Sequence, residues 1–172
     1  MGRFYKYILS FSLLLVACVC QANESDKASA LQQEQACQRA AAEYFDISYD
    51  ILLAIREVEG AWQGARLNNK NKSIDHGIMG INSVWEKTLN EHGITLEQVA
   101  DNNCMSIWVG AWILANYLHE AGAYSDSPDP EKYWRGIGYY NSHTKALNEK
   151  YALKVWQKLI ARQTRENKQE KE

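Results

Sequence analysis

The order of hydrophobic and polar positions predicts a series of helices. Residues 28–44 are rich in Ala, Gln and Glu and contain neither Gly nor Pro, which favours a helix. A second helix is expected after Ser48, a residue suited to capping, and is expected to end at Gly60. No run of alternating residues is long enough to build a sheet. These patterns predict a mainly α fold.

The rest of the chain continues the helical pattern. Residues 102–121 carry the broadest apolar surface and are predicted to be the central helix. A loop is expected at 68–75, which is polar, and a connection at 122–130, which collects Gly, Ser, Asp and both prolines. The other expected helices are 83–92, 131–138 and 145–161.

The N-terminal residues have the pattern of an export signal, expected to span 1–22. Arg3 and Lys6 precede an apolar stretch, 8–19, that ends in small residues. This stretch is about a dozen residues long, whereas a comfortable membrane span needs roughly 20. The pattern therefore predicts an exported protein, and an N-terminal membrane anchor stays open as the alternative.

The number of cysteines left after cleavage distinguishes two ways of processing this signal. Cleavage after Ala22 leaves Cys37 and Cys104, an even pair suited to an oxidising compartment. The Leu-Val-Ala-Cys sequence that ends at Cys18 also resembles a bacterial lipobox, in which this cysteine becomes the lipidated first residue. Lipidation would keep Cys20 as an unpaired thiol, so the count favours the soluble product over the lipoprotein.

Composition limits the class of protein. The chain has 172 residues, of which 46% are hydrophobic, enough for one domain with a core and too many for a disordered chain. A formal charge of −2 comes with no Lys- or Arg-rich block, so no nucleic-acid partner is expected. The domain is expected at 28–161, followed by a polar, solvated and disordered tail at 162–172, which holds no apolar residue.

The sequence lacks the residues that several kinds of chemistry require. No two histidines are spaced for one metal-binding helix face, and no cysteine pair has metal-ligand spacing. The sequence also lacks a Gly-rich phosphate loop and a Gly-x-Ser-x-Gly elbow. We therefore expect no metal and no cofactor.

Glu59 is the strongest candidate for chemistry. On a helix that turns about 100° per residue, Glu59 falls between Ile55 and Leu52 on the apolar arc. A carboxyl group that points toward the core loses hydration, which raises its pKa and keeps it usable as a general acid. The same position also fits a helix-end residue exposed by fraying, or the partner of an arginine.

Two later segments combine glycine with polar groups. Residues 71–82 hold two glycines three apart around Met79, an arrangement that allows a flat ligand to approach the backbone. Residues 138–142, Gly-Tyr-Tyr-Asn-Ser, offer a hydroxyl and an amide that can orient a carboxylate or bind sugar hydroxyls. The plainer alternatives are a loop with Met79 as core filler and a helix that ends in polar residues.

Taken in order, these segments resemble the small lysozyme-like lytic transglycosylases with an SLT domain. These periplasmic, peptidoglycan-cleaving proteins accompany secretion systems, conjugation machinery and pili. The family pattern is a helix ending in Glu-Ser, then Asp-x-Gly-Leu-Met-Gln-Ile-Asn, a Cys-x-Asn-Ile helix, and Tyr-Asn before the last helix. The matching places, spread over about 37–156, are Glu59-Gly60, Asp75-His76-Gly77-Ile78-Met79-Gly80-Ile81-Asn82, Asn103-Cys104-Met105-Ser106-Ile107 and Tyr140-Asn141.

The resemblance implies a single lysozyme-like domain with one disulfide, between Cys37 and Cys104. It also implies a periplasmic location and no cofactor. The expected partners are peptidoglycan glycan strands and components of a secretion, conjugation or pilus machine. No membrane-spanning segment is expected in the mature chain.

By resemblance, Glu59 is the only catalytic acid/base, and Tyr140 hydrogen-bonds or orients it. The acid protonates the glycosidic oxygen and then accepts the proton of the sugar's own C6 hydroxyl, which closes an anhydro ring. If Asp75 instead projects into the groove, the protein is a hydrolytic muramidase with two carboxylates. The residues expected to bind substrate are Asp75, Met79, Asn82, Tyr140 and Asn141.

Two residues depart from the family pattern. Gly60 replaces a Ser, which removes a hydroxyl beside the acid, and Gly80 replaces a Gln, which removes an amide expected to contact sugar. His76 and His143 are candidate substitutes for these polar contacts. A non-catalytic peptidoglycan-binding or assembly protein with the same fold is the alternative from another functional class.

Overall fold

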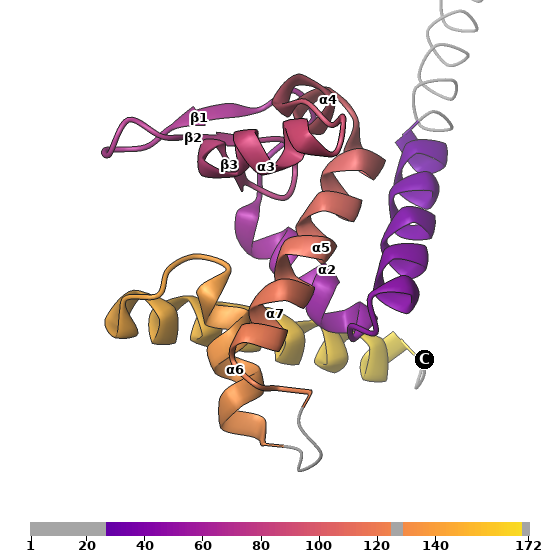
Figure 1. Ribbon diagram of the computed structural model, residues 1–172. Coiled ribbons are helices and arrows are strands. Elements are labelled where there is room, and N and C mark those ends of the chain that lie inside the picture. Colours follow the sequence, from indigo (N-terminus) through magenta and orange to yellow (C-terminus); the bar gives the residue numbers. More distant parts are fainter. Residues whose placement is uncertain (1–26, 125–128, 170–172) are drawn as a thin grey trace, which may run out of the picture. The chain divides into compact units, whose positions relative to one another are not determined.

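The computed structural model describes residues 27–124 and 129–169 (Figure 1). The chain divides into two units, Met1–Ala36 and Cys37–Glu172. In the first unit the described residues are helical, and the expected signal peptide at 1–22, with Cys18, lies outside them. The second unit holds every residue that is discussed as part of a site.

Helices build most of the second unit, which confirms the mainly α prediction. Residues 37–44 are helical, as expected. The elements that follow are α2 (Tyr49–Glu59), the 3-10 turn η1 (Ser83–Trp85), α3 (Glu86–Glu91), α4 (Leu96–Asp101), α5 (Asn103–Glu120), α6 (Pro130–Tyr139) and α7 (Lys145–Gln169).

The core forms around α5 and α2. Helix α5 packs against α4 and α6, while α7 packs against both α2 and α6. The apolar side chains that α5 buries completely are spaced three or four residues apart, at Ile107, Ala111, Leu114 and Leu118. The broad apolar surface predicted for 102–121 is therefore the surface that the other helices cover.

A small antiparallel sheet corrects the expectation that the chain forms none. Its strands are β1 (Arg66–Asn68), β2 (Ile74–His76) and β3 (Ile81–Asn82), in the order β1-β2-β3. Asp75 of β2 pairs with Leu67 on one side and with Asn82 on the other. Strands of two or three residues are too short to show alternation in a sequence, and the segment expected as a loop at 68–75 is the β1–β2 hairpin.

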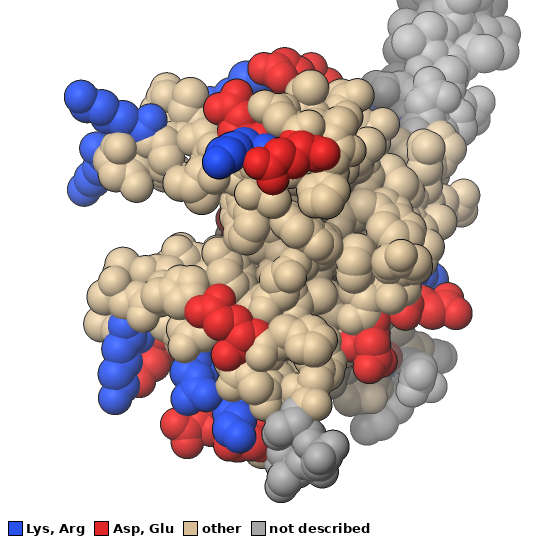
Figure 2. Space-filling model, viewed as in Figure 1, with Lys and Arg blue, Asp and Glu red and all other residues tan. Residues whose placement is uncertain are grey.

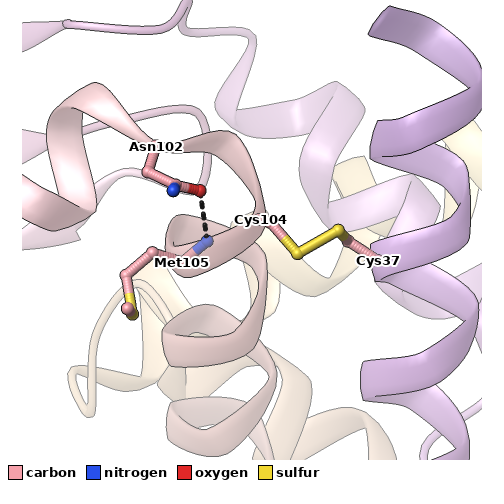
Figure 3. The surroundings of a disulfide bond; sticks show 4 residues. All are labelled: Cys37, Asn102, Cys104 and Met105. Carbon is pink, nitrogen blue, oxygen red and sulfur yellow. Dashed lines mark hydrogen bonds between the residues drawn. A yellow bond between two sulfur atoms is a disulfide. The ribbon is translucent and has the colours of Figure 1, made fainter. Parts of the chain in front are cut away.

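The disulfide between Cys37 and Cys104 is present, as the family resemblance implied (Figure 3). It joins the helical residues before α2 to the first turn of α5. At the start of α5, the Asn102 side chain accepts a hydrogen bond from the Met105 backbone N–H at 3.0 Å. The covalent link and the capped helix end therefore fix the same end of the central helix.

Loss of this disulfide is expected to lower the free energy of unfolding by about 4 kcal/mol, because the bond closes a loop of 67 residues in the unfolded chain. Denaturant titration with and without a reducing agent measures the difference. In the Cys37→Ser/Cys104→Ser double variant, the reductant is expected to have no effect. An equal midpoint for the oxidised and reduced wild-type protein would contradict the prediction.

The end of α7 corrects the predicted disordered tail. Residues 162–169 are polar and mostly exposed, as expected, but they continue the helix to Gln169. Lys, Arg, Glu and Gln are good helix formers, and Arg162 donates hydrogen bonds to Glu166 one turn later and to Glu57 of α2. Among the described residues, no helix combines the length and the apolar character that crossing a membrane requires.

Candidate active site

A cleft of about 670 Å³ lies between the small sheet and the region where α6 leads into α7. Figure 2 shows it as a hollow below the β1–β2 hairpin. The sheet side contributes Asn69, Lys70, Asn71, Ser73, Asp75, Gly80 and Asn82. The other side contributes Tyr117, Tyr139, Tyr140, Asn141, Ser142 and His143. Glu59 also lines the cleft, so a carboxyl group faces a surface of hydroxyls, amides and aromatic rings.

The local fold of α2 places Glu59 in this cleft. The helix buries Ile51 to Ile55 and ends at Glu59, the last residue before Gly60. Gly60 has φ +61°, a left-handed conformation that suits glycine, and its N–H bonds the Arg56 carbonyl. Ser48 holds the N-cap position without the predicted side-chain hydrogen bond. The Ser-to-Gly departure at position 60 therefore ends the helix cleanly beside the acid.

Burial changes the acidity of Glu59. The pKa of this carboxyl group is raised from 4.5 to about 7; loss of hydration is the largest cause, and the charge of Asp75 acts in the same direction. The Tyr151 hydroxyl and the Lys154 charge act in the opposite direction and lower the pKa. A carboxyl group with a pKa near neutrality can both give and take a proton at physiological pH, which is what a general acid/base needs.

Tyr151, and not Tyr140, hydrogen-bonds Glu59. The Tyr151 hydroxyl donates to Glu59 Oε1 at 2.5 Å, whereas the Tyr140 hydroxyl donates to the Met79 carbonyl at 2.9 Å. The two rings stack with centroids 6.2 Å apart, and Tyr151 belongs to α7. Burial raises the pKa of both tyrosines well above the usual value, which keeps them as donors. Tyr151 therefore makes the hydrogen bond that was expected of Tyr140.

Asp75 and Asn82 form a fixed pair in the cleft wall. Asn82 Nδ2 donates to Asp75 Oδ1 at 2.6 Å and to Ser73 Oγ at 2.8 Å. The Asn82 side-chain oxygen accepts from the Val84 N–H at 3.1 Å and so caps η1. Asp75 therefore holds the hairpin beside Asn82, while both residues also line the cleft.

Comparison with known proteins identifies the family of this chain. The family model of the transglycosylase SLT domain matches residues 36–161. The chain belongs to the SLT family. Its fold is accordingly lysozyme-like, and the membership supports a peptidoglycan enzyme of the lytic transglycosylase type.

Curated relatives of this SLT domain come from enteric bacteria. Invasion protein IagB of Salmonella typhimurium is 34% identical over 70% of this chain and 73% of the relative. Protein IpgF of Shigella flexneri is 30% identical over 75% of this chain and 80% of the relative. A peptidoglycan-binding-like protein of Escherichia coli O157:H7 is 29% identical over 77% of this chain and 78% of the relative.

Two residues predicted at the glycan groove of this SLT domain lie elsewhere. Met79 is 0% exposed and its side chain packs at Gly110 of α5, so the core-filler alternative is correct. His76 is also buried, with Nδ1 3.1 Å from the Ile74 carbonyl oxygen and 3.3 Å from that of Ile81. His143 does line the cleft: its ring stacks on Tyr139 at 4.2 Å.

Gly80 lets the acid lie against the backbone of the SLT domain. It has φ +60°, and a Cβ built at this position would collide with Glu59 Oε2. A Gln in this backbone conformation would be strained and would displace the carboxyl group. The Gln-to-Gly departure is therefore tied to the position of Glu59, a relation that the sequence pattern alone does not show.

Tyr151→Phe is expected to raise the pKa of Glu59 further, because the hydroxyl that stabilises the carboxylate is removed. Activity that needs the protonated acid is lost as the pH rises through this pKa, so the alkaline limb of the pH–rate profile moves to higher pH. In Tyr140→Phe, whose hydroxyl bonds Met79, the limb is expected to stay in place. A shift to lower pH in Tyr151→Phe would contradict the assignment.

Proposed function

We propose that this SLT domain cleaves the β-1,4 bond between MurNAc and GlcNAc in peptidoglycan and forms 1,6-anhydroMurNAc, with Glu59 as the only acid/base. One observation carries the proposal. Glu59 lines a cleft of hydroxyl, amide and aromatic groups, and burial raises its pKa to about 7. Membership of the SLT family supports the same reaction class.

The reaction needs one proton donor that later becomes an acceptor. Protonated Glu59 gives its proton to the glycosidic oxygen as the bond from C1 of MurNAc to that oxygen breaks. The resulting carboxylate takes the proton of the C6 hydroxyl, whose oxygen bonds to C1 and closes the anhydro ring. Atoms balance without water, and Glu59 ends protonated as it began.

The two oxygens of Glu59 have different surroundings. Oε1 accepts the Tyr151 hydroxyl hydrogen bond, and Oε2 lies beside Gly80, a residue of the cleft lining. We assign proton transfer to Oε2 and orientation of the carboxyl group to the Tyr151 contact. Asp75, Asn82, Tyr140 and Asn141 line the same cleft and are proposed to hold the sugars.

A hydrolytic muramidase is the second candidate, because Asp75 also lines the cleft. Its Oδ1 accepts a hydrogen bond from Asn82 at 2.6 Å, which favours a structural role over activation of water. Mass spectrometry of digested sacculi separates the two reactions. Transglycosylation gives chain ends that are lighter by one water, whereas hydrolysis gives reducing ends. Anhydro ends in both the wild type and Asp75→Asn would support the single-acid reaction.

We propose that the protein acts after export, in the periplasm, where it opens the wall locally for a secretion or pilus apparatus. The export pattern at 1–22 supports the location, and a relative named as an invasion protein supports the role. The mass of the mature protein tests the processing, since a chain that begins at Asn23 carries no lipid. A lipidated Cys18 would instead indicate an outer-membrane lipoprotein.

A further inference from the structure

The β1–β2 hairpin presents lysines at the mouth of the cleft. Its turn, residues 69–73, contains Lys70 and Lys72, and both are exposed. Figure 2 shows Lys and Arg side chains gathered at the hairpin tip, next to the hollow. Lys70 lines the cleft, whereas Lys72 is not among the described residues that line it. The turn therefore carries two positive charges, of which Lys70 belongs to the cleft lining.

Hydrogen bonds within the turn connect its residues to one another. The Asn69 N–H donates to the Ser73 carbonyl at 2.8 Å, and the Lys72 N–H donates to the Asn69 carbonyl at 3.0 Å. Asn71 Oδ1 accepts from both the N–H and the hydroxyl of Ser73, and Ser73 Oγ accepts from Asn82. This network connects the turn that carries Lys70 to the Asp75–Asn82 pair in the cleft wall.

Among the described residues, Lys70 has no acidic partner. Within residues 27–124 and 129–169, no carboxylate forms an ion pair with its ammonium group. The other basic side chain of the cleft, His143, lies with Nε2 2.9 Å from Glu120 Oε1. The remaining charges of the cleft, Glu59 and Asp75, are acidic. An anionic group of a substrate therefore has one unpaired cation to meet in this cleft.

We propose that Lys70 binds a carboxylate of the peptide stem on the glycan strand, and that it makes this site prefer peptide-bearing strands. The inference rests on the proposed cleavage of peptidoglycan. The N-acetylglucosamine units of such a strand are neutral, and its peptide stems carry carboxylates. Because Lys70 lies on an exposed turn at the rim, it is placed for a branch that leaves the cleft, while Asp75 and Asn82 face the sugars.

The test compares wild type, Lys70→Gln and Lys72→Gln on three substrates. These are peptide-bearing strands, the same strands with amidated peptide carboxylates, and bare strands that keep only the lactyl carboxylate. Lys70→Gln is expected to lower kcat/KM about three- to tenfold on peptide-bearing strands, through a higher KM. On the amidated strands, its kcat/KM is expected to equal that of the wild type. Lys72→Gln, which removes the same charge from the same turn, is expected to match the wild type on all three.

An equal loss with both lysine variants would overturn the inference, because it would indicate only the general field of the hairpin. An equal loss on bare and peptide-bearing strands would also overturn it, because it would assign Lys70 to a group that both strand types share and not to the peptide. Pelleting of each strand type with the same three proteins keeps the test independent of cleavage. If the wild type cleaves nothing, the proposed function fails, and selective loss of peptide-bearing strand binding in Lys70→Gln still decides the inference.

Discussion

Glu59→Gln is expected to lower the rate of glycan cleavage by about 10²- to 10⁴-fold, the range that a positioned general acid/base supplies. The amide keeps an oxygen that can accept the Tyr151 hydrogen bond, so the geometry of the cleft is retained. It has no proton to give to the glycosidic oxygen at neutral pH. Release of soluble fragments from purified sacculi measures the effect.

Glu57→Gln is the matched control for this loss. Glu57 lies two residues earlier on the same helix and accepts a hydrogen bond from Arg162 instead of facing the cleft lining. Its variant removes the same charge from α2 and is expected to cleave glycan at a rate close to that of the wild type. Equal losses in the two variants would contradict the role of Glu59.

Glu59→Gln is also expected to change how the free energy of unfolding depends on pH. Folding raises the pKa of Glu59 from 4.5 to about 7, so the folded state binds the proton more tightly than the unfolded state. The wild type is therefore fully stabilised below pH 4.5 and loses up to about 3 kcal/mol as the pH rises through about 7. Glu59→Gln lacks this loss and is expected to be the more stable protein at about pH 8 in denaturant titrations.

Gly80→Ala is expected to lower activity by about 10²-fold, because the added Cβ would collide with Glu59 Oε2 and displace the carboxyl group. The backbone at this position also has φ +60°, which costs stability for any residue with a Cβ. Rates on sacculi, measured together with the free energy of unfolding, separate displacement of the acid from loss of fold.

Gly93→Ala controls for the backbone strain alone. Gly93 has φ +72°, and a Cβ built there meets no atom within 4 Å. Both variants are expected to lose about 1 kcal/mol of stability from the left-handed conformation. Activity is expected to fall only in Gly80→Ala. A Gly80→Ala protein with wild-type activity would mean that the contact with Glu59 does not position the acid.

The sequence predicts the helices and the inward position of Glu59 because both depend on local periodicity. Leu52 and Ile55 are fully buried, and Glu59, which falls between them on the helical arc, reaches a site where hydration is lost. Helix α4 was not predicted, although Thr95 and Gln98 form a capping box that is visible in the sequence. The short strands of the sheet depend on pairing between segments, which periodicity does not report.

The choice between the two tyrosines could not be made from the sequence. Tyr151, Val155 and Leu159 follow one another at a spacing of four, and all three are buried, so Tyr151 has the pattern of a core residue. Its hydroxyl meets Glu59 across 92 positions of chain. Met79 was misplaced for a related reason: a glycine-rich turn allows a side chain to face either the cleft or the core, and the packing at Gly110 selects the core.

Digestion of sacculi in water labelled with ¹⁸O tests the central claim most directly. Closure of the anhydro ring by the C6 hydroxyl consumes no water, so the wild type is expected to release chain ends that carry no label and are lighter by one water. Sacculi incubated in parallel with Glu59→Gln are expected to release about 10²- to 10⁴-fold less of these products in the same time. Labelled reducing ends from the wild type would contradict the account, since they would require a water molecule as the nucleophile.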